Sequence, residues 1–281
     1  MFRYSVTQWI FGNEDVESSF KRLKKYGYDG IELGGEPGST DVTAVQQLMD
    51  KYELECTSIC GIYSGERDLS SSDESLRRKA IQYVKDCVDM AVTVGASLVI
   101  VVPSPVGKSG PDRTIRESWE HAVSSLKTAG QYAESKGIIL AVEALNRFET
   151  FLVNKLANAK KLVEEVNVPS VRIMADLFHM NIEERSHVEA LRNIAPYLAH
   201  VHIADNTREA AGYGQTNFSE VMEALLELGY KGAITMEFMP PVANPYLSAQ
   251  QNASTESSAV FDEYTHQSID HIKTIVKKLT E

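Results

Sequence analysis

The stretch Ile138–Glu143 reads IILAVE, an apolar strand-like run that ends in a carboxylate. Three later segments of the chain repeat this design and end in Asp176, His202 and Glu237. The four side chains stand about one strand–helix unit apart, and carboxylate and imidazole donors suit a hard-to-borderline divalent metal ion. The sequence therefore predicts one metal site if the four strands lie side by side.

The rest of the chain alternates strand-like runs and helical segments in the same way. The pattern starts with a strand at Phe2–Thr7 and ends with a helix at Phe261–Leu279. Alternation with short connections predicts parallel strands, and eight such units in 281 residues fit a closed barrel better than an open sheet. We therefore predict an α/β fold, a single (β/α)8 TIM barrel over residues 1–281, with its active site at the C-terminal ends of the strands.

Local signals predict where some helices begin and end. Ser71 and Glu74 form a capping-box pattern, which predicts the start of a helix that runs to Val94. Another helix is expected at Glu183–Ala195, after the strand that ends in Asp176.

Composition and charge argue against some classes of function. The chain has 28 basic and 39 acidic residues and a net charge of −11, whereas a nucleic-acid surface needs clustered lysine and arginine. Its apolar runs are shorter than the roughly 18 residues of a membrane span, and its N-terminus lacks the pattern of a signal peptide. The three cysteines are too few and too irregular for a disulfide framework. We expect a cytoplasmic protein without nucleic-acid or membrane partners.

Three short stretches resemble a known family of enzymes. Asn146–Glu149, Phe178–Glu184 and Met236–Glu237 are similar to the ketose 3-epimerases, the D-tagatose and D-psicose 3-epimerase group of the xylose-isomerase-like barrels. The resemblance implies a divalent-metal-dependent sugar epimerase or isomerase of carbohydrate metabolism, which acts on a small-molecule keto-sugar. It also implies one bound ion, Mn²⁺ in the first place, with Co²⁺ or Mg²⁺ as alternatives.

The same resemblance implies a role for each site residue. The metal ligands would be Glu143, Asp176, His202 and Glu237, and the substrate-binding residues would be Glu149, His179 and Arg208. Taken without the family pattern, His179 is more typical of a buried structural histidine, and Arg208 of a loop cation paired with a nearby acid.

The expected chemistry is proton transfer next to a ketone. A divalent ion stabilises the developing enediolate as a Lewis acid. Epimerisation then needs one base on each face of the enediolate, so we predict Glu143 and Glu237 as the catalytic pair, each a ligand and an acid/base. His179 and Arg208 would donate hydrogen bonds to oxygens on which negative charge grows.

Two loops depart from the family pattern, Pro103–Pro111 and Met239–Ser258. Because the metal residues are kept while these loops change, we expect a keto-sugar or its derivative to be the substrate and free ketohexoses to react only weakly. The 239–258 loop follows a strand of the active site, so it is either a plain surface loop or a lid or partner contact.

Two alternatives to the epimerase remain. One is a metal-dependent lyase that cleaves 3-oxo-C-glycosides, the catalytic subunit of a C-glycoside deglycosidase with a small partner subunit. The other is a non-catalytic sugar-binding barrel. We expect the chain to form homo-oligomers, with or without a small second subunit.

Overall fold

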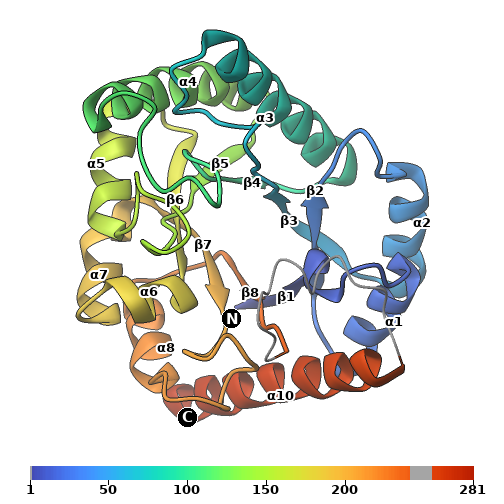
Figure 1. Ribbon diagram of the computed structural model, residues 1–281. Helices are drawn as coiled ribbons and strands as arrows, with labels where there is room; N and C mark the ends of the chain where they lie inside the picture. Colours follow the sequence, from blue (N-terminus) through green and yellow to red (C-terminus); the bar gives the residue numbers. More distant parts are fainter. Residues whose placement is uncertain (1, 241–254) are drawn as a thin grey trace.

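The structure is a computed structural model that describes residues 2–240 and 255–281. Its described strands are parallel and close into a barrel in sequence order, from β1 to β8, which confirms the predicted TIM barrel (Figure 1). The strands are β1 (Arg3–Thr7), β2 (Gly30–Gly35), β3 (Glu55–Gly61), β4 (Leu98–Val101), β5 (Ile139–Val142), β6 (Val171–Asp176), β7 (Leu198–Ile203) and β8 (Ala233–Met236). Pairing of β8 with β1, with Tyr4 opposite Ile234, closes the ring.

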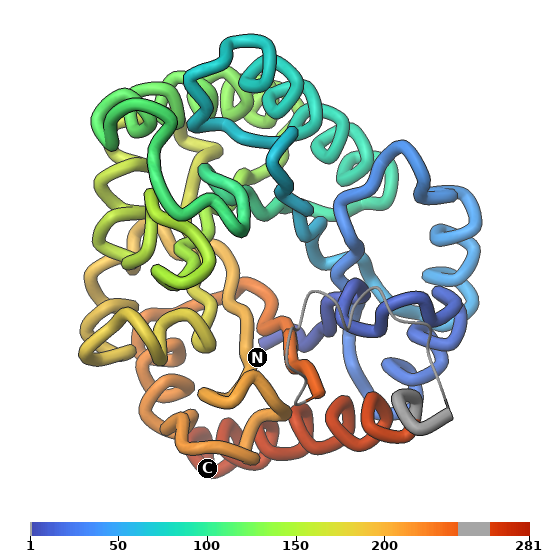
Figure 2. The backbone as a smooth tube through the Cα atoms, in the orientation of Figure 1, coloured from blue at the N-terminus to red at the C-terminus, as the bar shows by residue number. Residues whose placement is uncertain are grey.

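Helices surround the barrel on the outside (Figure 2). They are α1 (Val16–Tyr26), α2 (Val42–Tyr52), α3 (Glu74–Val94), α4 (Ile115–Ser135), α5 (Leu156–Val166), α6 (Leu177–Glu183), α7 (His187–Ile194), α8 (Phe218–Glu227) and α10 (Thr255–Thr280), with short 3-10 turns η1 (Gln8–Phe11) and η2 (Ala195–Tyr197). The last helix, α10, contacts both α1 and α8, so it joins the two ends of the helical layer.

Three helix boundaries differ from the sequence prediction. The last helix, α10, begins at Thr255, six residues before the predicted Phe261. Helix α3 begins at Glu74 with Asp73 as its N-cap, while the hydroxyl of Ser71 accepts the N–H of Asp73. The helix predicted at Glu183–Ala195 is the shorter α7, and the preceding α6 was not predicted. Asp176, the last residue of β6, is the N-cap of α6, so one carboxylate both ends a strand and begins a helix.

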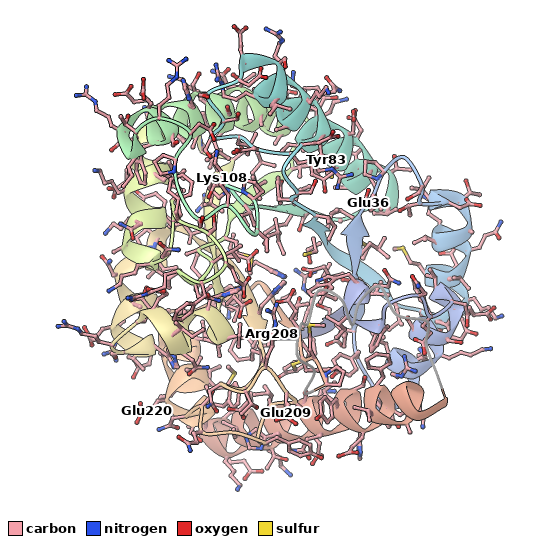
Figure 3. All side chains as sticks on the ribbon, in the orientation of Figure 1. Glu36, Tyr83, Lys108, Arg208, Glu209 and Glu220 are labelled. Carbon is pink, nitrogen blue, oxygen red and sulfur yellow. The ribbon has the colours of Figure 1, made fainter. Side chains whose placement is uncertain are left out.

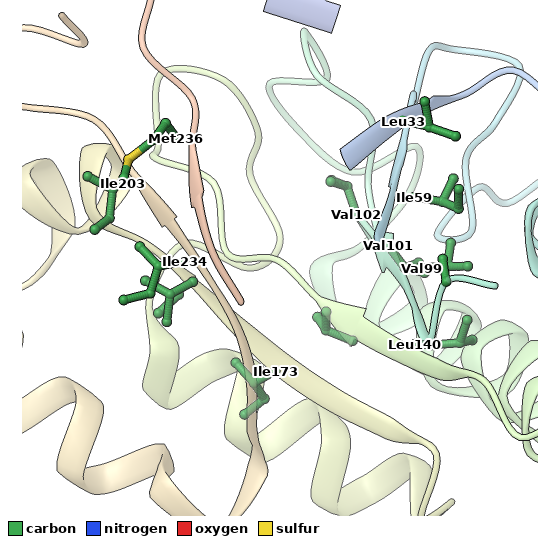
Figure 4. Close-up of a cluster of buried hydrophobic side chains, with 14 of the residues drawn as sticks. Leu33, Ile59, Val99, Val101, Val102, Leu140, Ile173, Ile203, Ile234 and Met236 are labelled. Carbon is green, nitrogen blue, oxygen red and sulfur yellow. The ribbon is translucent and has the colours of Figure 1, made fainter. Parts of the chain in front are cut away.

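A large apolar core fills the space between the strands and the helices. Figure 4 labels part of it, from β2 to β8: Leu33, Ile59, Val99, Val101, Val102, Leu140, Ile173, Ile203, Ile234 and Met236. Continuous burial of this kind is expected for parallel strands that are covered by helices.

The interior of the barrel has an apolar part and a polar part. A small apolar cluster on β3 to β6 consists of Cys60, Leu98, Ile100, Ala141 and Met174. Elsewhere in the interior, Glu32 of β2 contacts His200 of β7, although these two strands are not neighbours. Their contact therefore crosses the inside of the barrel.

Most of the loop predicted at 239–258 lies outside the described residues, and its last residues, from Thr255, belong to α10 and not to a loop. At its start, Met239 is buried and its N–H donates to the carbonyl oxygen of Arg208 at 2.6 Å. None of the helices in the described ranges has the length and apolar character that crossing a membrane requires.

Candidate active site

The four predicted metal ligands lie at the C-terminal ends of β5 to β8. Glu143 and Glu237 directly follow β5 and β8, and Asp176 pairs in register with His202 on the adjoining strands β6 and β7. All four side chains are buried. Ligand atoms of Glu143, Asp176 and His202 lie within 4.8 Å of one another, and Oε2 of Glu237 is 3.4 Å from Nδ1 of His202. The strand ends thus bring the four donors together.

Two buried atoms of this group make no hydrogen bond to the described part of the chain: Oδ2 of Asp176 and Nδ1 of His202. The other oxygen of Asp176, Oδ1, accepts the N–H of Phe178 in the helix cap, which leaves Oδ2 facing the group. A buried polar atom without a partner costs about 1–3 kcal/mol. Three carboxylates and one imidazole are a suitable donor set for a divalent cation, so these residues fit a metal ion.

The charges of the group support the same conclusion. Burial, together with Glu237 and Asp176, raises the pKa of Glu143 well above its usual value, and burial next to Glu237 raises the pKa of Asp176 to about 8. Burial lowers the pKa of His202, but Glu32 and Glu237 outweigh burial and raise this pKa well above its usual value. The group therefore holds protons at neutral pH, and a divalent cation would displace them.

Glu237 differs from the other carboxylates. Burial raises its pKa, but the charges of His202 and Arg208 outweigh burial and hold the pKa at about 2. The indole N–H of Trp9, which follows β1, donates to Oε1 of Glu237 at 3.0 Å. Glu237 is therefore the ionised member of the pair Glu143 and Glu237.

A second group with metal-binding residue types shares His202. It consists of Glu32, His200 and His202, all buried in the barrel interior. The carboxylate of Glu32 already accepts hydrogen bonds from Ser58 Oγ at 2.6 Å and His200 Nε2 at 2.9 Å, and it faces His202 Nε2 at 3.0 Å. Ser58 and His200 both reach Oε2, while Oε1 makes no hydrogen bond among the described residues. This group has one carboxylate, whereas the group around Glu143 and Asp176, with Glu237 beside it, has three and is the better site for an ion.

His179 lies on α6, beside the predicted ligands. Its Nδ1 accepts the backbone N–H of Asn146 at 3.2 Å, so the proton of the neutral ring is on Nε2. Nε2 lies 3.5 Å from Asp176 Oδ2 and 3.8 Å from Glu143 Oε1. Burial, with Arg208 nearby, lowers the pKa of His179 to about 3, which makes it a neutral hydrogen-bond donor at the site.

Arg208 lies in the loop between β7 and α8, on the side of the barrel where β8 ends (Figure 3). Its guanidinium nitrogens are 3.5 Å from Glu149 Oε1 and 3.5 Å from Glu237 Oε2, and the group stacks over the ring of Phe178 at 4.6 Å. Its φ of 66° is unusual for a residue other than glycine, and such strain is typical of functional sites. The structure thus brings Arg208, Glu149 and His179 to the same mouth as the four predicted ligands.

The Pro103–Pro111 loop is attached to the same mouth. The N–H of Gly107 donates to the carbonyl oxygen of Glu149 at 2.8 Å. Lys108 pairs at 2.7 Å with the buried carboxylate of Asp68 in the loop after β3. The loop that departs from the family pattern is therefore held beside a residue of the site.

Sequence reasoning missed several residues of this region, among them Trp9, Asn146 and Glu32. Asn146 donates from Nδ2 to Glu149 Oε1 at 2.9 Å, and this contact holds Glu149 beside Arg208. Of the three, Glu32 had a signal in the sequence, because it is a charged residue between two apolar residues in a strand that helices cover. Trp9, in η1, and Asn146, the first residue of the Asn146–Glu149 stretch, reach the site from the segments that follow β1 and β5.

Comparisons with known proteins agree with the fold. The family model described as xylose isomerase-like TIM barrel matches residues 20–262. An L-ribulose 3-epimerase from Methylomonas sp. (strain DH-1) is 31% identical over 225 residues, which are 79% of this chain and 78% of that protein. A 3-dehydro-D-guloside 4-epimerase from Escherichia coli (strain K12) is 29% identical over 235 residues, 81% of this chain and 88% of that protein.

A solved structure extends the likeness to nearly the whole chain. The D-allulose 3-epimerase from Methylomonas sp. in complex with D-allulose has a TM-score of 0.86 and 25% identity, and the match covers 97% of this chain and 96% of that chain. The chain belongs to the xylose isomerase-like TIM barrel family, in which its relatives include ketose 3-epimerases.

Proposed function

We propose that the protein is a divalent-metal-dependent keto-sugar epimerase of the ketose 3-epimerase type. The observation that carries this proposal is the convergence of Glu143, Asp176, His202 and Glu237, in which Asp176 Oδ2 and His202 Nδ1 lack a hydrogen-bond partner among the described residues. The names of the relatives, all sugar epimerases, support the activity. The proposed ion is Mn²⁺, with Co²⁺ or Mg²⁺ as alternatives.

In the proposed mechanism, Glu143 and Glu237 transfer the proton. When bound, the ion supplies Lewis-acid stabilisation of the negative charge that grows on the substrate. Glu143 and Glu237 follow β5 and β8, which are not neighbouring strands, so they reach a substrate from different sides. One carboxylate removes the proton next to the ketone, and the other returns a proton to the opposite face, which inverts the carbon.

The different pKa values of Glu143 and Glu237 support different roles for the two carboxyls in proton transfer. Without an ion, the pKa of Glu143 is raised and that of Glu237 is lowered to about 2, so the two carboxyls have unequal surroundings. A bound cation lowers both pKa values, and the different neighbours of the two groups remain. Trp9 fixes Oε1 of Glu237, which leaves Oε2 facing His202 and Arg208.

The remaining site residues bind the substrate in this proposal. His179 donates from Nε2, and Arg208 donates from its guanidinium, to oxygens that gain negative charge in the transition state. Glu149, held by Asn146, accepts from a substrate hydroxyl and orients Arg208.

The proposed substrate is a keto-sugar derivative, such as a 3-oxo-glycoside, in preference to a free ketohexose. The Pro103–Pro111 loop departs from the ketose 3-epimerase pattern and is held beside Glu149, so it would contact the far end of the substrate. The Escherichia coli relative is named for a 3-dehydro-guloside, a keto-sugar in glycosidic form. The epimerase names of the relatives favour epimerisation over the lyase reaction.

The metal proposal predicts pH-dependent binding. Purified protein treated with a chelator should lose activity and regain it with Mn²⁺ or Co²⁺. Since Glu143, Asp176 and His202 hold protons at neutral pH, ion binding should release protons and become tighter as the pH rises through about 8. Titration calorimetry in buffers of different ionisation enthalpy measures the number of protons released and the dissociation constant of the ion at each pH.

Asp176→Ala and His202→Ala should weaken Mn²⁺ binding by more than the roughly 10–100-fold that is typical of residues outside the ligand shell. Glu220→Gln, on the exposed surface of α8, is the control and should leave binding unchanged. Full activity of the metal-free protein contradicts the proposal.

The two-base proposal predicts that Glu143→Gln and Glu237→Gln each lower turnover by ~10²-fold or more, because each keeps the shape of the side chain but removes the base. Exchange of the substrate's α-proton in D₂O separates the two roles. At least one variant should retain exchange with a single epimer while interconversion is lost. Turnover at the wild-type rate in either variant removes that glutamate from the mechanism.

The substrate proposal predicts turnover of 3-oxo-glycosides and only weak activity on free fructose, psicose or tagatose. A panel of free ketoses, their phosphates and 3-oxo-glycosides, each with Mn²⁺, measures this preference by chromatography. Fast interconversion of a free ketose at C3 would refute the proposed role of the loop. Release of an aglycone from a 3-oxo-C-glycoside would instead establish the lyase. No reaction with any compound, in protein that binds Mn²⁺, contradicts the proposed epimerase.

A further inference from the structure

Glu32 is a charged residue in the middle of the barrel that the proposed mechanism does not use. It lies on β2 with no exposed surface, and the barrel places β2 far from β7 in strand order. Even so, its carboxylate contacts His200 Nε2 at 2.9 Å and His202 Nε2 at 3.0 Å, both on β7. Burial of a carboxylate is costly unless the group is paired. The question is therefore what the protein gains from a carboxylate at this place in the barrel.

The two nitrogens of the His202 ring face different groups on opposite sides of the ring. Nε2 lies against the carboxylate of Glu32, with its two oxygens at 3.0 and 3.2 Å, whereas Nδ1 faces Glu237 and the proposed metal position. A neutral imidazole has one N–H donor and one acceptor nitrogen. A carboxylate can only accept, so it selects the tautomer with the proton on Nε2 and leaves the lone pair of Nδ1 for a metal ion.

A polar network holds Glu32 in this position. Ser58 donates from Oγ to Glu32 Oε2 at 2.6 Å, and His200 approaches the same oxygen. His200 Nε2 is also 3.2 Å from Thr235 Oγ1, which in turn is 2.6 Å from Ser5 Oγ. The network therefore connects β1, β2, β3, β7 and β8, and it fixes the carboxylate from several sides.

We propose that Glu32 is a positioning residue of the metal centre, which holds His202 in the tautomer and orientation that present Nδ1 to the ion. In metal sites, a carboxylate behind a histidine ligand commonly has this role, and its loss weakens metal binding by roughly 10–100-fold. The inference rests on the proposed metal centre. It adds a residue from β2, on the far side of the barrel from His202, to the determinants of ion affinity.

The test is the dissociation constant of Mn²⁺ in Glu32→Gln. Ser58, His200 and His202 all direct donors at this side chain, and a glutamine offers one acceptor oxygen and an NH₂ group that would face a donor. Glu32→Gln should therefore weaken Mn²⁺ binding by about 10–100-fold, measured by calorimetry on the metal alone. Glu32→Asp keeps the charge but withdraws it by one methylene, so its dissociation constant should lie between those of the wild type and Glu32→Gln.

The matched control is Met174→Leu, a volume-conserving change in the apolar part of the barrel interior, which should leave the dissociation constant within about threefold. A double-mutant cycle shows whether Glu32 acts through His202, because the effect of Glu32→Gln should largely disappear in a His202→Asn background. If Glu32→Gln does not fold, as judged by circular dichroism, the dissociation constant of Glu32→Asp is compared with that of the wild type instead.

The possible results separate this inference from the proposed function. If the wild type binds no divalent ion, the metal centre itself is wrong. If the wild type binds Mn²⁺ and the Glu32 variants bind it within about threefold of the wild type, as the control does, only the positioning role is wrong. An undiminished effect of Glu32→Gln in the His202→Asn background also overturns that role.

Discussion

Three carboxylates, from Glu143, Asp176 and Glu237, are buried together at one end of the barrel, and their mutual repulsion is the constraint on which the site depends. Burial, together with this repulsion, raises the pKa of Glu143 and of Asp176, so the group favours either protons or a cation. Each carboxylate sits at the end of a strand whose backbone is hydrogen-bonded on both sides. The closed barrel therefore holds in place groups that would otherwise move apart.

The interior of the barrel supports this arrangement because its two parts differ. The apolar cluster on β3 to β6 fills space without hydrogen bonds, while the polar network places Glu32 behind His202. Above the strands, the strained backbone of Arg208 brings a guanidinium between Glu149 and Glu237. Charges of alternating sign thus extend from the barrel interior to its mouth.

The sequence predicts the barrel and the four strand-end residues because both follow from local patterns. Each candidate ligand ends an apolar run, and parallel strands place such ends at one edge. The partners of these residues depend on contacts across the barrel and between loops, which leave no periodic signal. Trp9 was missed for this reason. Glu32 has a local signal, a charge between two apolar residues of a covered strand, but that signal does not say which residues it contacts across the barrel. Helix α6 was missed because its cap, Asp176, was interpreted only as a ligand.

The central claim is that an ion binds between Glu143, Asp176, His202 Nδ1 and Glu237. X-ray diffraction from crystals grown with Mn²⁺, with data collected at the manganese absorption edge, tests this claim most directly. The account predicts one anomalous peak within about 2.0–2.5 Å of all four side chains, on the Nδ1 side of His202. A peak on the Nε2 side, between Glu32 and His200, or no peak in the barrel would contradict it.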